Sequence, residues 1–501
     1  MMSNKWLILS LIIVIYLPVS IDATVLHVAV PTLSVQLSAS ANDLLWIIDI
    51  YSLVMAGLLL PMGALGDRLG YKKLAVIGLA IFGFASLGAA LAPNAIVLII
   101  TRAMLAIGAA MILPATLAGV RKTFSDDNER AMALGIWATV GVAGAAIGPL
   151  VGGYLLQYFY WGSVFLINIP IVIFAIMAIL IIIPYQEQNT QQKWEIGKAL
   201  LFIVGILLLI YAIKTMFRSS GEFVIPLILG ITGFIIIFSF IKNELNSTAP
   251  MIDFSLLKQK VLAMGTVMAM TAMISIVGFQ LLMAQELQFV YDLTPLKAGL
   301  FMLPLMLASG FGGPIAGWLV VRFGLRLVAT GGIVISSFSF FGLALCDFLT
   351  SPYIAWALMV LLGLSVGIAL LASTTAIMST APVNKSASAG AIEGMAYELG
   401  AGFGIVLFGM MLTVIYSHNI VIPDGLLPAQ IGLVESSISE AFSVAKHIDR
   451  PELSEQLIYA AKEAFVNAHE FVLVIAGTLL AILSYFVWQF LPNKVEAIKH
   501  N

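Results

Sequence analysis

The feature that most constrains the fold of this chain is a series of about fourteen apolar runs, each long enough to cross a membrane. Only 10% of the 501 residues are charged, whereas a soluble domain carries about 25%. The runs cover residues 7–31, 44–65, 74–92, 95–119, 131–156, 162–184, 197–216, 223–242, 261–285, 296–320, 327–348, 353–379, 388–416 and 467–491. The sequence therefore predicts an all-α membrane protein whose surface lies mostly in the lipid bilayer.

The cysteine and histidine residues argue against an enzyme. The single cysteine, Cys346, excludes an internal disulfide framework. The five histidines are scattered, and the sequence contains no H-x-x-x-H, no G-x-S-x-G and no phosphate-binding loop. We therefore expect no catalytic residue, no metal, no bound cofactor and no nucleic-acid partner, and we expect the protein to act as a monomer.

Basic residues in the connections predict the orientation of the helices, because cytoplasmic loops are enriched in Lys and Arg. If both termini lie in the cytoplasm, the connections on that side hold 17 of the 24 Lys and Arg residues. The external connections then hold six, among them Lys214, and Arg102 lies within a run. The sequence therefore predicts an even number of spans with both termini in the cytoplasm.

An internal repeat divides the chain. The stretch "GALGDRLGYKKL" follows the second run and "GWLVVRFGLRLV" follows the tenth, 254 residues later. The matching positions are Gly63 with Gly317, Arg68 with Arg322 and Gly70 with Gly324. We predict two six-helix halves, 1–186 and 259–501, joined by a segment with two inserted helices, 187–258. Repeats of this kind place a transporter's substrate site near mid-membrane between the halves.

The one sizeable polar segment, 417–466, precedes the last run and lies outside in this orientation. It reads as short amphipathic helices around Pro451. Two interpretations remain open: a solvated loop, and a gate over an external mouth.

Several motifs resemble those of a known transporter family. "GALGDRLGYKK" resembles the loop motif of the major facilitator superfamily, and "GVAGAAIGPLVGG" at 141–153 resembles its antiporter motif. "IDATVLHVAVP" resembles the first-helix signature of the fourteen-helix drug:proton antiporters, and "WIIDIYSLVMAG" resembles the QacA-like exporters. The resemblance implies a bacterial cytoplasmic-membrane antiporter driven by the proton gradient, which exports lipophilic and quaternary ammonium cations, dyes and antiseptics.

Two alternatives lead to other functions. A proton-coupled transporter of the same fold could export another small metabolite or peptide. Acids outnumber Arg102 within the runs by about four to one, which argues against an anionic substrate. A multi-span enzyme or sensor is disfavoured by the missing catalytic motifs and by the repeat.

Charged residues within the runs are candidates for proton coupling and cation binding, because a charge in hydrocarbon is costly. We single out Asp22, Asp49, Arg102, Glu393 and Glu398. At about 1.5 Å per residue, Asp22 lies roughly 14 Å and Arg102 roughly 10 Å from the external side. The similar depths predict an Asp22–Arg102 neighbour pair, which serves proton handling or only structure. Burial favours the neutral form of a carboxyl group, so such acids can exchange protons near neutral pH.

The remaining acids lie at different depths. Asp49 is about one and a half turns below the external surface, Glu398 is near mid-membrane, and Glu393 is nearer the cytoplasm. Residues five apart on a helix point about 140° apart, so both glutamates cannot face one cavity. Glu286, at the end of its run, reads as interfacial.

His27 stands where the antiporter family usually has Asn. It could relay protons to Asp22, or simply hydrogen-bond a neighbouring helix.

Two further motifs are candidates for conformational gating. In the first loop, Gly63 and Gly70 permit a tight turn, and the resemblance implies that Asp67 and Arg68 take part in an ionic latch on the cytoplasmic side. The second copy carries Val321 in place of Asp67, so the latch would be one-sided. The alternative for these charges is a topology signal alone.

The run 131–156 carries Gly144, Gly148 and Gly152 four residues apart, on one helix face that lets another helix approach closely. Pro149 can kink this helix. The resemblance implies that this face forms a tight seam between the two halves.

Overall fold

The structure is a computed structural model that describes residues 2–37, 39–183, 196–216, 224–247, 250–348, 350–382 and 385–493. Fourteen helices among these residues are long and apolar enough to cross a membrane, which confirms the all-α, fourteen-helix prediction. The long helices are α1 (Met2–Gln36), α2 (Ala41–Leu69), α3 (Tyr71–Ala90), α4 (Ala95–Thr123), α5 (Asp127–Tyr158), α7 (Asn168–Ile182), α8 (Ile196–Met216), α9 (Val224–Asn246), α10 (Lys260–Gln285), α11 (Pro295–Phe323), α12 (Leu325–Ala344), α13 (Pro352–Thr380), α14 (Ser386–Asn419) and α17 (Pro451–Phe490). The short ones are α6 (Ser163–Leu166), η1 (Phe254–Lys258), η2 (Glu286–Val290), α15 (Pro428–Ser436) and α16 (Ile438–Ala445).

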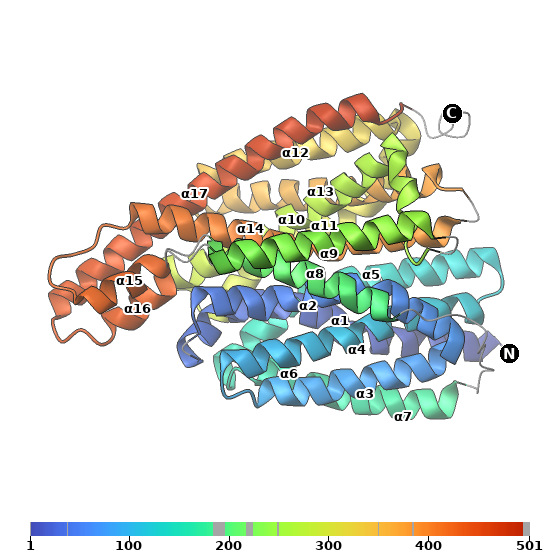
Figure 1. Ribbon diagram of the computed structural model, residues 1–501, viewed down its shortest axis with the longest axis horizontal. Helices are drawn as coiled ribbons and strands as arrows, with labels where there is room; N and C mark the ends of the chain where they lie inside the picture. Colours follow the sequence, from blue (N-terminus) through green and yellow to red (C-terminus); the bar gives the residue numbers. More distant parts are fainter. Residues whose placement is uncertain are drawn as a thin grey trace.

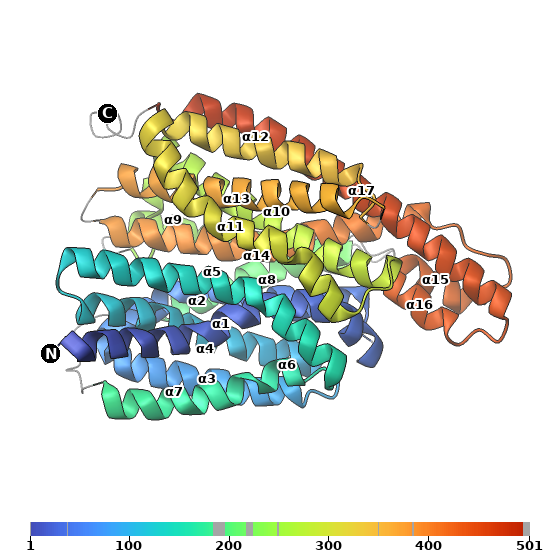
Figure 2. The same ribbon diagram turned by 180° about the vertical axis from the view of Figure 1, so that it is seen from behind.

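Two groups of helices lie side by side with their axes nearly parallel (Figures 1 and 2). Helices α1–α7 form one group, and α10–α14 with α17 form the other. Within the first group α1 packs on α5, and α2 and α3 pack on α4. Within the second, α10 packs on α14, and α11 and α12 pack on α13. The same order of contacts recurs in the two groups, as expected of a duplicated unit.

The turns at the two copies of the repeated motif have the same backbone form. Gly70 ends α2 and precedes α3, with a φ angle of 82°. Gly324 ends α11 and precedes α12, with a φ angle of 86°. Side chains disfavour this positive φ, so glycine is the residue that allows one helix to follow the other directly.

The two groups meet along two pairs of helices, α5 with α11 and α2 with α14. The inserted helices α8 and α9 pack on each other, and α8 also packs on α2. In Figure 1 these green helices lie across the boundary between the two groups. Phe202 and Ile206 of α8 share a core with Leu53 of α2 and Met395 of α14. The inserted pair therefore covers one side of the boundary.

The ends of the bundle differ. Helix α1 begins and α17 ends at one end, which we call the terminal end (Figure 1). At the opposite end, which we call the hairpin end, α15, α16 and the start of α17 project beyond the other helices. Pro451 is the first residue of α17, where proline is well tolerated. The predicted polar segment therefore ends in one helix that continues directly into the last span.

Candidate functional site

Asp22 and Arg102 form a buried ion pair between α1 and α4. Their side chains are 0% and 2% exposed, respectively. Arg102 Nε also donates a hydrogen bond of 3.1 Å to the Ile47 carbonyl of α2, and its guanidinium lies 4.5 Å from the centre of the Tyr51 ring. The neighbour relation predicted from the two depths is therefore present, and it ties three helices together.

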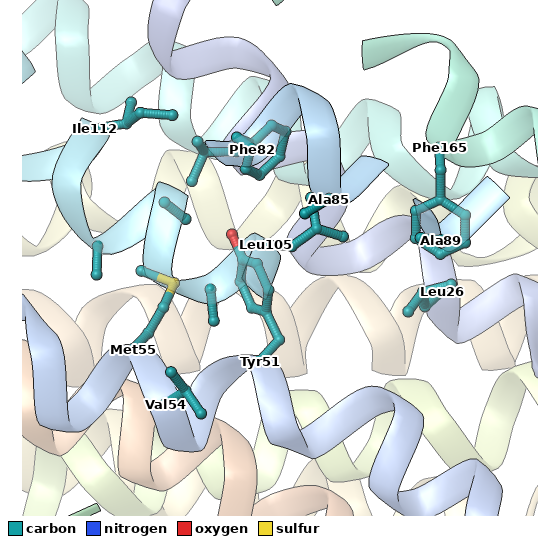
Figure 3. Close-up of a cluster of buried hydrophobic side chains, with 14 of the residues drawn as sticks. Leu26, Tyr51, Val54, Met55, Phe82, Ala85, Ala89, Leu105, Ile112 and Phe165 are labelled. Carbon is teal, nitrogen blue, oxygen red and sulfur yellow. The ribbon is translucent and has the colours of Figure 1, made fainter. Parts of the chain in front are cut away.

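Tyr51 stands at the centre of this arrangement. In Figure 3 its ring projects from α2 beside Met55 and points toward Leu105 of α4. Phe82 of α3 completes the same buried cluster. The pair therefore lies against a rigid apolar wall, which excludes water and strengthens the attraction between the charges.

The glycine face of α5 packs against α1. A Cβ atom on Gly148 would lie 3.0 Å from the Ile21 carbonyl and would collide with the Thr24 hydroxyl. Gly144 and Gly152 likewise face Ser20 and Val25 of α1. This contact lies within one half, so it differs from the expected seam between the halves. The small residues instead set the position of the α1 segment that carries Asp22.

Pro149 lies at the boundary between the halves. A Cβ atom on Gly299 of α11 would lie 2.6 Å from the Pro149 carbonyl oxygen. On the other boundary, a Cβ atom on Gly402 would lie 2.7 Å from Leu53. Nearer the terminal end, the corresponding distance from Gly394 to Leu59 is 3.8 Å. Of these two α2–α14 contacts, the one nearer the hairpin end is the tighter.

Asp49 pairs with Lys214 of the inserted helix α8, at 2.6 Å between Lys214 Nζ and Asp49 Oδ2. The two side chains are 0% and 1% exposed. Lys214 Nζ also lies 3.9 Å from the centre of the Trp46 ring. The sequence analysis placed Lys214 in an external connection. That placement is wrong, because Lys214 is a buried residue of α8 and lies within the apolar run 197–216.

The two glutamates of α14 point in different directions, as their five-residue spacing predicts. Glu393 accepts hydrogen bonds from Thr374 of α13 and from Tyr397, the latter at 2.6 Å. Glu398 is half-buried and lies beside Ser52 of α2. No basic side chain in the described part of the chain pairs with either glutamate.

Two tyrosine side chains lie within range of the charge of Glu398. Tyr16 of α1 and Tyr51 of α2 both lie close enough for the charge of the carboxylate to act on their hydroxyl groups. Tyr16 also stacks on Trp137 of α5, with 4.5 Å between the ring centres. Glu398 therefore faces the other half of the molecule across a boundary lined by aromatic rings.

The gating candidates of the first loop lie at the terminal end. Arg68 is in the last turn of α2, and Gly70 forms the turn itself. Gly63 lies inside α2, so the prediction of a tight turn there is wrong, and a Cβ atom on it would come no closer than 3.9 Å to Pro114. Asp67 is in the same last turn as Arg68. Its role in a latch stays a prediction.

His27 and Glu286 are both buried. No hydrogen bond joins His27 to Asp22 among the described residues, so the relay stays a prediction. The Glu286 carboxyl group contacts Nδ1 of His469 of α17, and the rings of Phe279 and Phe348 lie about 6 Å from the imidazole. The interfacial interpretation of Glu286 is wrong, because α17 extends far enough to cover it.

The polar segment before the last span covers the boundary between the halves at the hairpin end. Ile438 of α16 and Phe465 of α17 close a cavity of about 40 Å³. Ile48 of α2 and Tyr416 of α14 line it from the two halves. Part of this segment is therefore packed against the bundle and is not a fully solvated loop.

The profile of the Major Facilitator Superfamily matches residues 12–405. The chain belongs to the major facilitator superfamily. It is a multi-pass membrane transporter and not an enzyme. The methyl viologen resistance protein SmvA of Salmonella typhimurium is 53% identical over 487 residues, which cover 97% of this chain and 98% of the relative. The multidrug efflux pump LfrA of Mycolicibacterium smegmatis is 34% identical over 484 residues, 95% and 94% of the two chains.

Solved structures show the same fold. A bacterial homologue of the human lysosomal transporter Spinster, in an inward-facing and unoccupied conformation, superposes with a TM-score of 0.67. The two chains are 17% identical, and the match covers 97% of this chain and 98% of the other. This chain therefore shares its overall arrangement of helices with that transporter.

Proposed function

We propose that this protein is a proton-coupled antiporter of a bacterial cytoplasmic membrane, with both termini in the cytoplasm, that exports lipophilic and quaternary ammonium cations, dyes and antiseptics. The observation that carries the proposal is Glu398, a half-buried acid at the boundary between the halves with no basic partner among the described residues. A carboxylate in a low-dielectric site attracts a cation strongly. The same carboxylate can hold a proton instead.

The relatives support this substrate class. One is named for resistance to methyl viologen, a flat organic molecule with two positive charges, and another for multidrug efflux. Aromatic faces next to a carboxylate suit such cations, because a ring attracts a cation lying over it. Tyr16 and Tyr51 are aromatic residues that lie close enough to Glu398 for its charge to act on them.

Competition between the two ligands couples the two fluxes. A cation bound at ionised Glu398 leaves when a proton neutralises the carboxyl group, and the next cation displaces that proton. An arginine guanidinium group does not readily lose its proton. Protonation of Asp22 would therefore free the charge of Arg102 and loosen the tie between α1, α2 and α4, which links proton binding to a change in packing.

The packing of the boundary fits a state that loads its substrate from the cytoplasm. On the α2–α14 boundary, contacts are tighter at the hairpin end, between Gly402 and Leu53, than toward the terminal end, between Gly394 and Leu59. In the proposed orientation the terminal end faces the cytoplasm. Export then requires the opposite ends to exchange roles, so that α2 and α14 approach at the terminal end and the hairpin moves off the external end.

The membrane potential distinguishes possible stoichiometries. Moving one charge through 100 mV is worth about 2.3 kcal/mol. Exchange of one proton for a monovalent cation moves no net charge, so only the pH gradient drives it. A second titrating acid, for which Asp22 and Glu393 are candidates, would let the potential contribute.

The experiment uses purified protein in lipid vesicles, with ethidium and a benzalkonium cation as substrates. We expect an imposed pH gradient to drive cation transport and its collapse by nigericin to stop it. Cation movement that ignores the pH gradient would refute proton coupling. A vesicle in which neither cation moves, while a neutral metabolite or peptide does, would refute the substrate class.

A further inference from the structure

Trp46 and Asp49 of α2 form a cation site in which a residue of the protein itself is bound. The Lys214 ammonium group lies 2.6 Å from Asp49 Oδ2 and 3.9 Å from the centre of the Trp46 ring. A carboxylate on one side and an aromatic face on the other are the groups with which proteins bind quaternary ammonium ligands. We call this pair of side chains the Trp46–Asp49 box. It offers a cation the same kinds of group as the proposed substrate site, a carboxylate and an aromatic ring.

The cation comes from outside the duplicated halves. Lys214 belongs to α8, which is one of the two inserted helices. The lysine side chain is 1% exposed and the aspartate side chain 0% exposed, so bulk water does not screen the pair. Removal of one partner from such a pair leaves an uncompensated buried charge. The inserted helix thus supplies a counter-charge that the six-helix half lacks.

The box lies next to the proposed substrate site. Ser52, which lies beside Glu398, follows Asp49 by three residues, or about one helical turn. The Asp49 carbonyl oxygen is also 4.0 Å from where a Cβ atom on Gly402 of α14 would be. A cation at the boundary between α2 and α14 would therefore meet two carboxylates, of which the structure neutralises only Asp49.

We propose that Lys214 is a specificity-determining residue that fills the Trp46–Asp49 box and excludes transported cations from it. As a result the cargo binds the unpaired acids of α14. This inference deepens the proposed function and rests on it for the identity of the cargo. The chemical class of ligand that the empty box would take is a small alkylammonium or quaternary ammonium ion.

A chemical-rescue experiment tests the box without any transport. Lys214→Ala removes the ammonium and leaves space for a small cation. We expect the variant to melt at a lower temperature than wild type, and we expect millimolar n-butylammonium or tetramethylammonium to raise that temperature. The same salts should have no such effect on wild type or on the matched control Lys214→Ala/Asp49→Asn. Sodium chloride at equal ionic strength controls for screening.

Equal responses of Lys214→Ala and the double variant would overturn the inference, because the added cation would then not be binding at Asp49. If Lys214→Ala folds only when tetramethylammonium is present during purification, that result also supports it. Failure to fold under both conditions would count against it, since the added cation should replace the missing charge.

A second variant keeps the test independent of folding. Asp49→Asn/Lys214→Met removes both charges and preserves most of the volume. We expect it to bind ethidium within about threefold of wild type, because the acids of α14 hold the cargo. A loss of affinity of tenfold or more would show that Asp49 itself binds cargo and would overturn the assignment. The melting-temperature measurement and the ethidium-binding measurement need no proton gradient. Each can therefore support this inference even if the protein turns out not to couple transport to protons.

Discussion

The buried acids of this protein have two kinds of neighbour. Asp22 and Asp49 each pair with a basic side chain, Arg102 and Lys214 respectively. The acids of α14 have hydroxyl neighbours instead. A hydroxyl group can donate a hydrogen bond to the ionised carboxylate or accept one from the neutral carboxylic acid. A buried ion pair is destabilised strongly when one partner is lost. Substitutions of the paired and the unpaired acids should therefore have different effects on stability and on transport.

For Asp22→Asn, we predict a loss of about 3–5 kcal/mol in stability, because Arg102 remains buried without its partner. Coupled efflux should also be lost. The control Asp22→Asn/Arg102→Gln should regain most of the stability, measured by thermal unfolding in detergent, and remain inactive in vesicles. Wild-type efflux by either variant would remove Asp22 from proton coupling.

For Glu398→Gln, we predict unchanged folding and loss of pH-driven efflux, because the side chain keeps its shape but can no longer exchange a proton. Glu393→Gln is the matched control on the same helix. It keeps an oxygen for the hydrogen bonds of Tyr397 and Thr374, so efflux should fall by less than about tenfold. Initial rates in vesicles of equal protein content measure both. The reverse ranking would move the cation site to Glu393.

At the scale of the elements, small residues decide how closely α5 and α1 approach. The glycine face of α5 packs on the segment of α1 that carries Asp22, and Thr24 donates a hydrogen bond of 2.8 Å to the Ala145 carbonyl. Without a hydrophobic driving force between helices in lipid, this close packing is a principal source of helix association. The position of Asp22 therefore depends on residues of another helix.

For Gly148→Ala, we predict a loss of about 1–3 kcal/mol in stability, because the added methyl group collides with Thr24 and cannot be accommodated without a backbone shift. Gly135→Ala, on the same helix, has open space within 4 Å and should change stability by less than about 1 kcal/mol. Thermal unfolding compares the two. Equal effects would show that the α1–α5 contact is not tight.

Two polar side-chain contacts attach α17 to the end of α10 and the turn that follows it. Glu286 pairs with His469 in the interior, and Lys462 pairs with Asp292 at the surface, at 2.6 Å. For His469→Ala we predict faster protease cleavage in the exposed segment near Val421, because loss of the buried partner loosens α17. Lys462→Ala should change cleavage little, since an exposed pair is worth about 1 kcal/mol or less. Similar rates for the two variants would contradict this.

The sequence predicted the helices better than their ends. Apolar runs locate spans, but the first turns of α17 are amphipathic, so its start at Pro451 was missed and the proline was read as a break between short helices. Depth along the helices predicted the Asp22–Arg102 pair, because both residues lie well inside their spans. The partner of Asp49 was not predicted, because packing of the inserted helix against α2 brings Lys214 to it and no local pattern records that contact.

At the scale of the whole molecule, two similar halves meet along two helix pairs, and the hairpin end is covered by α16 and α17. The duplicated turns at Gly70 and Gly324 have matching backbone geometry in the two halves. The unpaired Glu398 lies where they meet. The central claim is that a cation and a proton compete for this carboxyl group.

Proton release on cation binding tests this claim most directly. Tetraphenylphosphonium, a non-titrating cation, is added to the purified protein in weakly buffered detergent solution near neutral pH, and a pH indicator dye reports released protons. We predict release of protons that saturates with cation binding and is reduced or lost in Glu398→Gln. Saturable cation binding by the wild-type protein without proton release at any pH between about 5 and 8 would contradict the account.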